Sequence, residues 1–227
     1  MQPYFFPYIG YYQLINSIDI FIIYDNLKYT KKGWINRNRI LLNGADEVIS
    51  LPLKSDSDAL NICDRTLSPD YDPKNLLNKI KGAYHKAPYF REIYPFLEGV
   101  ISVSERNLFQ YLYHSIASTC NILALKPQIL VSSSISIDHT LKGVDKVIAL
   151  CEATGAKSYI NAIGGIELYS RDLFRARGID INFVQTNSLQ YSQFSNNFVP
   201  WLSIIDVLMF NSLTNVQKII AEDYKLI

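Results

Sequence analysis

Residues 140–162, TLKGVDKVIALCEATGAKSYINA, decide the fold. Their first part has the apolar spacing of a helix over about Thr140–Thr154, which Gly155 ends, and Ser158–Ala162 is a short apolar strand. Short apolar strands that alternate with helices are typical of parallel βαβ units, and they predict an α/β fold with a mainly parallel, Rossmann-like sheet. The same alternation continues on both sides, with further elements predicted at Gln128–Val131 (strand), about Gly165–Arg177 (helix) and Ile179–Gln185 (strand).

The first half of the chain adds another strand to this pattern. Ile20–Tyr24 is continuously apolar, as is usual for a strand buried on both faces of a parallel sheet. We therefore expect it in one sheet with residues 158–162 and 179–184. Helices are predicted over Gly10–Asn16, Lys74–His85 and Asn107–Asn121, and from Leu202 onward after a polar aromatic stretch at Leu189–Trp201.

A hairpin is predicted around Asn43-Gly44, because both residues tolerate positive φ. Residues 34–42 and 48–53 would pair antiparallel across this turn. The alternation of side chains along a strand then puts Arg37 and Arg39 on one face, with Asn36 and Asn38 on the other. The simplest organisation is one α/β domain over residues 1–227, with the hairpin and helices inserted around residues 34–125.

Composition limits the functions that the chain can have. Its 227 residues carry a net charge of +1, which argues against a general nucleic-acid coat or strong attraction to a membrane surface. The apolar run at Ile20–Tyr24 is too short to cross a bilayer, so no membrane insertion is expected. Three scattered cysteines without C-x-x-C predict reduced thiols in the cytoplasm and neither a disulfide framework nor a metal site.

One segment of the chain is strongly basic. Residues 28–39 contain no acid, and five cations lie there: Lys28, Lys31, Lys32, Arg37 and Arg39. Arginine binds phosphate or carboxylate through two donors, so the segment is a candidate anion site, and Trp34 or Tyr29 could stack on a base. The alternative for the lysines is a solvated hairpin surface.

Candidate catalytic side chains follow two predicted elements. Asp25 comes where the buried strand ends, and in open parallel sheets that end faces the ligand crevice. It is a candidate general base or ammonium anchor, and a turn former is the alternative. Asp138-His139 resembles an acid–base pair, but Asp138 is also a good helix N-cap, so His139 is the candidate base of the two.

A glycine pair follows the strand Ser158–Ala162. Backbone amides at a helix start can hold a phosphate and glycine permits its close approach, which makes Asn161 and Gly164 candidate substrate-binding residues. The spacing is neither that of a dinucleotide fingerprint nor that of a P-loop.

The opening stretch, MQPYFFPYIGYYQLINSIDIFIIYDN, is too rich in proline near its start for an ordinary strand or helix. We expect a rigid extended loop that packs Phe5, Phe6 and Tyr12 into the core and forms one wall of the crevice. The residues predicted to converge there on one pocket are Gln2, Tyr4, Tyr11, Asp25, Arg37, Asn38 and Arg39.

Five segments together resemble the WbqC-like protein family: QPYFFPYIGYYQLI, KKGWINRNRI, AYHKAPYF, DHTLKGVDKVIALCEATGAKSYI and FVPWLSIIDVLMFN. That family occurs in bacterial gene clusters for O-antigen and other surface polysaccharides. The resemblance implies a transferase that attaches an amino acid, most plausibly glycine, to the amino group of a nucleotide-linked amino-deoxy sugar.

Tyr8-Ile9-Gly10-Tyr11 also resembles, more weakly, the H-I-G-H signature of nucleotidylyltransferases and class I aminoacyl-tRNA synthetases. The resemblance implies a role for Tyr8 and Tyr11 at a phosphate-binding helix start. Tyrosine stays neutral at pH 7, so it stabilises developing phosphate charge less than histidine does.

The predicted roles follow from these observations. Asp25, His139 and Tyr11 are the candidate catalytic residues, and the predicted substrate-binding residues are Gln2, Tyr4, Tyr8, Lys32, Trp34, Arg37, Asn38, Arg39, Asn161 and Gly164. The activated glycine donor stays open between glycyl-tRNA, an ATP-derived adenylate and a carrier thioester, and the acceptor end of a charged tRNA is a candidate partner. The alternative functions are a non-catalytic nucleotide-sugar-binding module and a nucleotidyltransferase-like enzyme.

Overall fold

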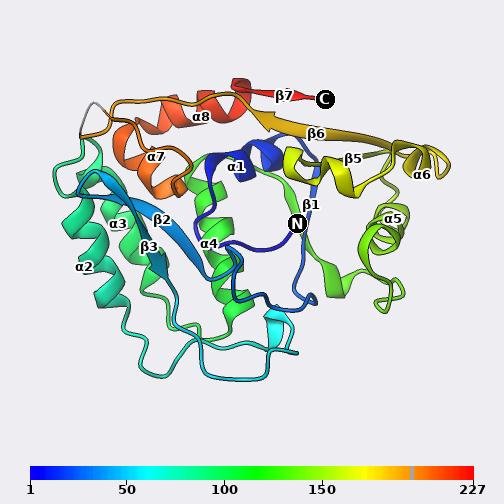
Figure 1. Ribbon diagram of the computed structural model, residues 1–227, viewed down its shortest axis with the longest axis horizontal. Helices are drawn as coiled ribbons and strands as arrows, with labels where there is room; N and C mark the ends of the chain where they lie inside the picture. Colours follow the sequence, from blue (N-terminus) through cyan, green and yellow to red (C-terminus); the bar gives the residue numbers. More distant parts are fainter. Residues whose placement is uncertain (195–196) are drawn as a thin grey trace.

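The computed structural model describes residues 1–194 and 197–227 (Figure 1). Ser195 and Asn196, within the predicted stretch Leu189–Trp201, lie outside the described residues. The helices are α1 (Ile9–Asn16), α2 (Pro73–Tyr84), α3 (Phe90–Ile101), α4 (Leu108–Ile122), α5 (Gly143–Ala153), α6 (Arg171–Arg175), α7 (Ile204–Phe210) and α8 (Leu213–Glu222). The strands are β1 (Ile20–Ile23), β2 (Arg37–Leu42), β3 (Ala45–Ser50), β4 (Gln128–Val131), β5 (Ser158–Ala162), β6 (Asp180–Thr186) and β7 (Tyr224–Leu226).

The α/β class and the parallel pairing are confirmed, but the single sheet is wrong. β1 pairs parallel with β4, while β5 pairs parallel with β6, and β7 adds an antiparallel strand to β6. The expected partners of β1 therefore lie in a separate sheet, because the second edge of β1 faces a cavity and not β5. A large Rossmann-like sheet is not formed by the described strands.

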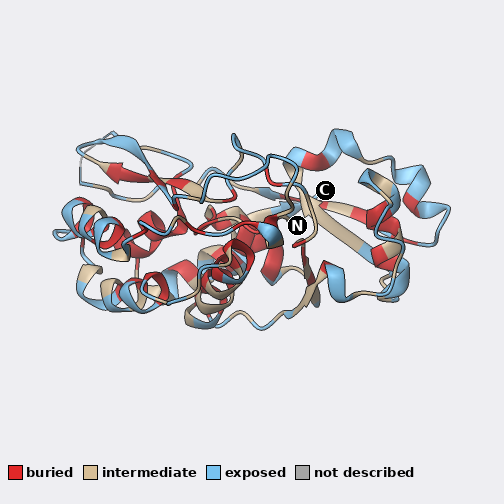
Figure 2. Ribbon diagram, turned by 90° about the horizontal axis from the view of Figure 1, so that it is seen from below, coloured by how far each residue is buried: buried red, intermediate tan, exposed pale blue. Residues whose placement is uncertain are grey.

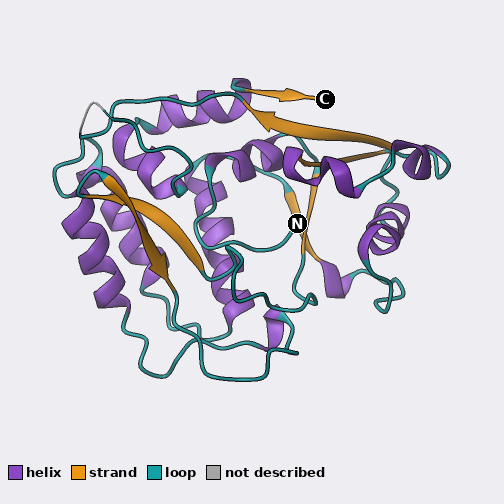
Figure 3. Cartoon of the chain, in the orientation of Figure 1, coloured by secondary structure: helices purple, strands orange, loops and turns teal. Residues whose placement is uncertain are grey.

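The hairpin is confirmed, with a shorter turn than expected. β2 and β3 pair antiparallel from Arg37↔Ser50 to Leu42↔Ala45. Asn43 and Gly44 have φ values of 51° and 79°, which is the requirement of a two-residue turn with positive φ at both positions. The second strand accordingly begins at Ala45 and not at residue 48. Figure 3 shows the hairpin beside α2 and α3, on the side of the molecule away from α5.

The predicted helix over residues 165–177 is wrong. A 3₁₀ helix, Ile163–Leu168, is followed by an extended Tyr169 and then by the short α6. Tyr169 is extended at φ −129° and ψ 128°, and its ring packs on Phe174 and Tyr159 with centroids 5.8 and 5.6 Å apart. This aromatic packing competes successfully with helix propensity.

The helices α1, α2, α4 and α5 lie where the sequence predicts them, within about three residues at each end. The core packs around α1, α4 and α7, and a smaller group of buried side chains joins α5 and α6 to β6. Figure 2 shows buried positions on the inward faces of the helices and exposed positions on their outer faces. In residues 1–194 and 197–227, no helix combines the length and the apolarity needed to cross a membrane.

The opening segment is held against the hairpin by one side chain. The amide nitrogen of Asn38 donates to the carbonyl oxygens of Phe5 and Phe6, at 3.0 and 2.8 Å. Phe6 has a positive φ of 42°, and Ser203 also donates to its carbonyl, at 2.7 Å. Phe5, Phe6 and Tyr12 are fully buried, as the sequence predicts.

Candidate active site

The carboxyl ends of β1 and β4 meet at one edge, because Ile23 lies opposite Val131 in their parallel register. Asp25 follows β1, and Ser132 and Ser133 follow β4. One carboxylate oxygen of Asp25 accepts a hydrogen bond from the Ser132 hydroxyl at 2.8 Å and from the Ser133 backbone N–H at 3.0 Å. Polar side chains from two parallel strands are therefore gathered at the edge where open α/β sheets bind ligands.

Asp25 is held as a carboxylate. Its exposed fraction is only 6%, and burial alone would raise its pKa. The hydrogen bonds from Ser133 and Ser132 outweigh burial, so the pKa of Asp25 lies below its usual value. A carboxylate with a lowered pKa is a weak base, which favours the ammonium-anchor role over proton abstraction.

Asn26 connects the end of β1 to two other elements. Its side-chain oxygen accepts from the Lys146 ammonium at 3.2 Å and lies 2.8 Å from the Ser132 hydroxyl, whose single proton it shares with Asp25. Its amide nitrogen lies 3.0 Å from His139 Nδ1, while His139 Nε2 lies 3.0 Å from the Ile135 carbonyl oxygen. An amide donor and a carbonyl acceptor together assign a neutral ring with the proton on Nε2.

Lys146 was not among the site residues predicted from the sequence. It lies four residues after Lys142 and directly after Asp145. It projects from α5, is 4% exposed, and its ammonium lies 5.8 Å from the centre of the Tyr24 ring. Burial lowers the pKa of Lys146, and the charge of Asp25 opposes this by raising it. Its spacing of four residues from the buried Leu150 puts it on the inward face of the helix, and that was the available signal.

Asp138 is a local turn former and not the predicted helix N-cap, because α5 begins only at Gly143 with Lys142 at its N-cap position. Its carboxylate accepts from the Thr140 N–H at 2.9 Å and from the Thr140 hydroxyl at 2.7 Å. These bonds lower the pKa of Asp138. His139 accordingly takes its partners from Asn26 and Ile135 and not from its neighbour in the sequence.

The tyrosines of the opening segment bond to that segment itself. The Tyr11 hydroxyl donates to the backbone oxygen of Gln2 at 2.9 Å, and the Tyr4 hydroxyl donates to the side-chain oxygen of Gln2 at 3.1 Å. Burial raises the pKa of Tyr11 well above its ordinary value. Tyr11 is thus a neutral donor that fixes Gln2, next to the point where Tyr24 N–H bonds to Met1 O at 2.9 Å.

The two arginines of the hairpin share one face, as predicted, and both lie near the ring of Trp34. Their guanidinium carbons lie 5.6 Å (Arg37) and 5.4 Å (Arg39) from the centre of the Trp34 ring. Arg37 donates to the backbone oxygens of Gly33 and Lys32, at 3.0 and 2.7 Å. Lys32 and Trp34 are exposed.

Arg39 connects the hairpin to a second region of the surface. It pairs with Asp46 at 3.0 Å and donates to the Trp201 carbonyl oxygen at 3.3 Å. Among the hydrogen bonds and ion pairs of the described residues, none joins Arg37 or Arg39 to Asp25. The predicted convergence therefore resolves into two groups of contacts, one around Asp25 and one around Arg39, with the opening segment passing between them.

An aromatic pocket of about 640 Å³ lies beside the second group. Tyr8 and Trp201 form part of its wall, with ring centroids 5.1 Å apart and planes inclined at 49°. Trp201 is 61% exposed and has a positive φ of 61°, an unusual conformation for so large a side chain. The described residues that line the pocket are Tyr8, Asn187, Ser188, Leu189, Gln190, Tyr191, Asn197, Phe198, Pro200 and Trp201.

Asn161 and Gly164 lie apart from this pocket. Asn161 is the penultimate residue of β5, and its side-chain oxygen accepts from the Ala162 N–H at 2.8 Å. Gly164 is exposed in the 3₁₀ helix, so the long helix that would have pointed its first amides at a phosphate is absent there. A Cβ added to Gly165 would lie 2.9 Å from the Asn161 amide nitrogen, which explains a glycine at that position by packing.

Comparison with known proteins places the chain in a family. The model of the WbqC-like protein family matches residues 2–218. The chain belongs to the WbqC-like protein family. The uncharacterized protein Rv1507c of Mycobacterium tuberculosis (strain ATCC 25618 / H37Rv) is 26% identical over 216 residues, which cover 93% of this chain and 91% of that protein. No solved structure matches the chain significantly.

Proposed function

We propose that this WbqC-like protein is a cytoplasmic transferase that attaches glycine to the amino group of a nucleotide-linked amino-deoxy sugar in surface-polysaccharide biosynthesis. The observation that carries the proposal is the buried Lys146, which donates to Asn26 and feels the charge of Asp25 at the carboxyl edge of two parallel strands. Ionisable groups with shifted pKa values at such an edge are typical of catalytic sites.

The reaction needs a free amine, a group that stabilises an oxyanion and a route for one proton. The sugar amine attacks the activated carbonyl carbon of the glycyl donor, and an amide bond forms as the bond to the leaving oxygen or sulfur breaks. Lys146 supplies positive charge and N–H donors for the oxyanion. His139 accepts the amine proton once Asn26 releases its Nδ1, which is the acceptor nitrogen of the neutral ring.

Asp25 and Tyr11 have positioning roles in this scheme. Asp25 orients Ser132 and Ser133 and attracts the protonated form of the incoming amine. Tyr11 fixes Gln2, which together with Tyr4 presents polar groups beside the end of β1.

The aromatic pocket is the proposed binding site for the nucleotide part of the substrate. A base or sugar ring can stack on the Tyr8–Trp201 wall, and Arg39 beside it can attract the diphosphate. Arg37, Lys32 and Trp34 extend this positive, aromatic surface along the hairpin. Asn38 supports the site indirectly, because its hydrogen bonds to Phe5 and Phe6 hold the opening segment in place.

A non-catalytic nucleotide-sugar-binding module is the second candidate, and the aromatic pocket alone supports it. Incubation with nucleotide-linked amino sugars and with glycyl-tRNA, or with glycine and ATP, followed by mass spectrometry of the sugar, separates the two. We expect a glycylated sugar from the intact protein and none from Lys146→Met. Binding of the nucleotide sugar without any mass change with every donor would favour the module, and pyrophosphate release without glycylation would favour a nucleotidyltransferase.

A further inference from the structure

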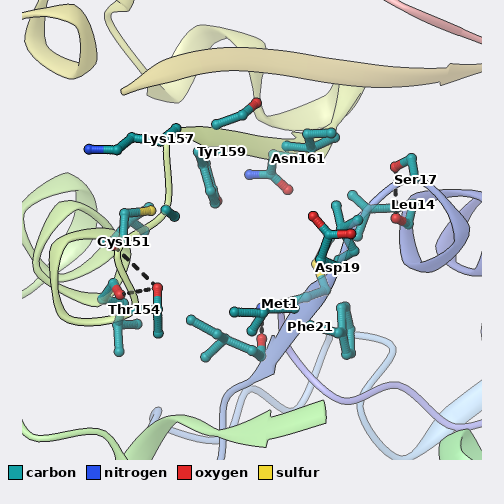
Figure 4. A pocket seen from close by; sticks show the side chains of 18 of the residues that line it. Met1, Leu14, Ser17, Asp19, Phe21, Cys151, Thr154, Lys157, Tyr159 and Asn161 are labelled. Carbon is teal, nitrogen blue, oxygen red and sulfur yellow. Dashed lines mark hydrogen bonds between the residues drawn. The ribbon is translucent and has the colours of Figure 1, made fainter. Parts of the chain in front are cut away.

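The edges of two parallel strands face each other across a cavity. In the described part of the chain, β1 has β4 as its only strand neighbour, and β5 has only β6. A cavity of about 500 Å³ lies between the two edges that have no strand partner, bounded also by α1 and α5. Figure 4 shows Tyr159 and Asn161 of β5 on one side of this space and Asp19, which precedes β1, on the other. We call this space the slot.

Backbone groups of both strands point into the slot. Gln128 N–H donates to Asp19 O at 2.9 Å, so the backbone of Asp19 faces β4, and the alternation along a strand turns Ile20 and Ile22 toward the slot. On β5, Asp180 N–H donates to Lys157 O at 2.9 Å, so the backbone of Lys157 faces β6. The same alternation turns the backbone groups of Ser158 and Ile160 toward the slot from the other side.

The backbone of Met1 shows how this edge is used. Its nitrogen donates to Ile22 O at 2.7 Å, and its carbonyl oxygen accepts from Tyr24 N–H at 2.9 Å. In a parallel ladder, one residue bonds to two residues of the neighbouring strand that lie two positions apart. Burial lowers the pKa of the Met1 amino group to about 5, so this position favours an uncharged nitrogen, such as that of an amide.

Most side chains around the slot are apolar, and several of them are incompletely covered. Ile20, Ile22 and Ile160 are only half-buried, although strands of continuous apolar sequence in parallel sheets are normally covered on both faces. The charged residues Asp19 and Lys157 lie outside the strands, directly before β1 and β5. Strand edges without charge or proline present unpaired backbone groups and are templates for another strand.

We propose that the slot is a strand-acceptor site for an extended apolar peptide segment, which lies in line with the backbone of Met1 and parallel to β1 and β5. Such a segment pairs with Ile20 and Ile22 on one side and with Ser158 and Ile160 on the other. It joins the two small sheets into one, in the order β4–β1–segment–β5–β6–β7. Its recognition is β-augmentation, in which main-chain hydrogen bonds supply affinity and side-chain pockets supply selectivity.

Amide hydrogen exchange tests the proposal on two extended proteins. One carries a Val/Ile-rich segment of about five residues, a usual strand length, fused before Met1, and its matched control carries a Gly/Ser segment of equal length. We expect the amides of Ile22 and Ile160 to exchange at least about tenfold more slowly in the first protein. Equal exchange at Ile160 in the two proteins would overturn the proposal.

A substitution at the slot supplies an independent test. Ser158→Pro removes an N–H that faces the slot from an exposed position at the first residue of β5, where proline is tolerated. It should lower the unfolding temperature of the Val/Ile protein more than that of the Gly/Ser protein, and Ser158→Ala should lower neither. Equal effects of Ser158→Pro would refute pairing with β5. If a free Val/Ile peptide protects Ile160 and the fused segment does not, the alignment with Met1 is wrong.

Discussion

Asn26 and Lys146 lie 120 positions apart in the sequence and are joined by a hydrogen bond of 3.2 Å. This contact ties the end of β1 to α5, and through Asn26 it also reaches Ser132 and His139. A buried lysine needs a strong reason to persist, because an unpaired ammonium is costly away from water. Here its partner is a neutral amide, with the Asp25 carboxylate nearby.

Lys146→Met should abolish glycine transfer with little loss of stability. Methionine fills a similar volume, and replacing a buried charge with an apolar side chain is often neutral or stabilising. Loss of the proposed oxyanion donor should reduce turnover by at least about a hundredfold. Turnover and thermal unfolding are measured on the same preparation. The control is Lys142→Met, since Lys142 is exposed just before α5; equal activity in both variants would remove Lys146 from the mechanism.

Asp25→Asn should make the free energy of unfolding depend less on pH under acid conditions. Burial alone would raise the pKa of Asp25, but hydrogen bonds from Ser133 and Ser132 lower it below the usual value of an aspartate. A carboxyl group whose pKa is lower in the folded state stabilises the protein at pH above its unfolded value, about 3.9. That contribution disappears as the pH falls through the folded pKa.

Urea unfolding from pH 6 down to pH 3 measures the effect. Intact protein should lose stability below about pH 4 more steeply than Asp25→Asn does, because asparagine still accepts from Ser133 N–H but does not titrate. Parallel curves for the two proteins would show that Asp25 is not held as a carboxylate.

Local sequence signals predicted the elements well because each depends on neighbouring residues. The turn at Asn43-Gly44 needs positive φ at both positions, and the sequence identifies it directly. β4 and β5 have the predicted bounds, because turn-forming residues flank short apolar runs. α3 was missed because Pro95 lies inside it, and a proline normally argues against a helix interior.

Contacts between distant residues were beyond that reasoning. Apolar periodicity identifies a strand but not its neighbour, so β1 was expected in one sheet with β5 and lies instead across the slot from it. In the candidate site, Asp25 was found because it ends a strand. The spacing from Leu150 puts Lys146 on the apolar face of α5, but only the packing of α5 shows that this face meets Asn26 at the end of β1.

Asn38→Ala should destabilise the fold through the opening segment. The substitution leaves the carbonyl oxygens of Phe5 and Phe6 with fewer donors in a buried place, and we expect a loss of about 2–4 kcal/mol in the free energy of unfolding. Asp46→Ala, on the partner strand, removes only an exposed ion pair with Arg39 and should cost less than about 1 kcal/mol. Similar losses in the two variants would contradict the bracing role of Asn38.

Trp201 separates stability from binding, because its backbone is strained while its ring is exposed. At a φ of 61°, glycine avoids the steric cost that alanine pays, so Trp201→Gly should be more stable than Trp201→Ala by about 1 kcal/mol. Both variants lose the ring that packs on Tyr8, and both should bind the nucleotide sugar more weakly by about 1–3 kcal/mol, the usual contribution of a stacked base. Calorimetric titration and thermal unfolding measure the two effects separately.

The control is Leu168→Ala, which changes an exposed apolar residue away from the pocket. It should change neither the binding of the nucleotide sugar nor the order of stability of the two Trp201 variants. Unchanged affinity in both Trp201 variants would place the nucleotide elsewhere on the protein.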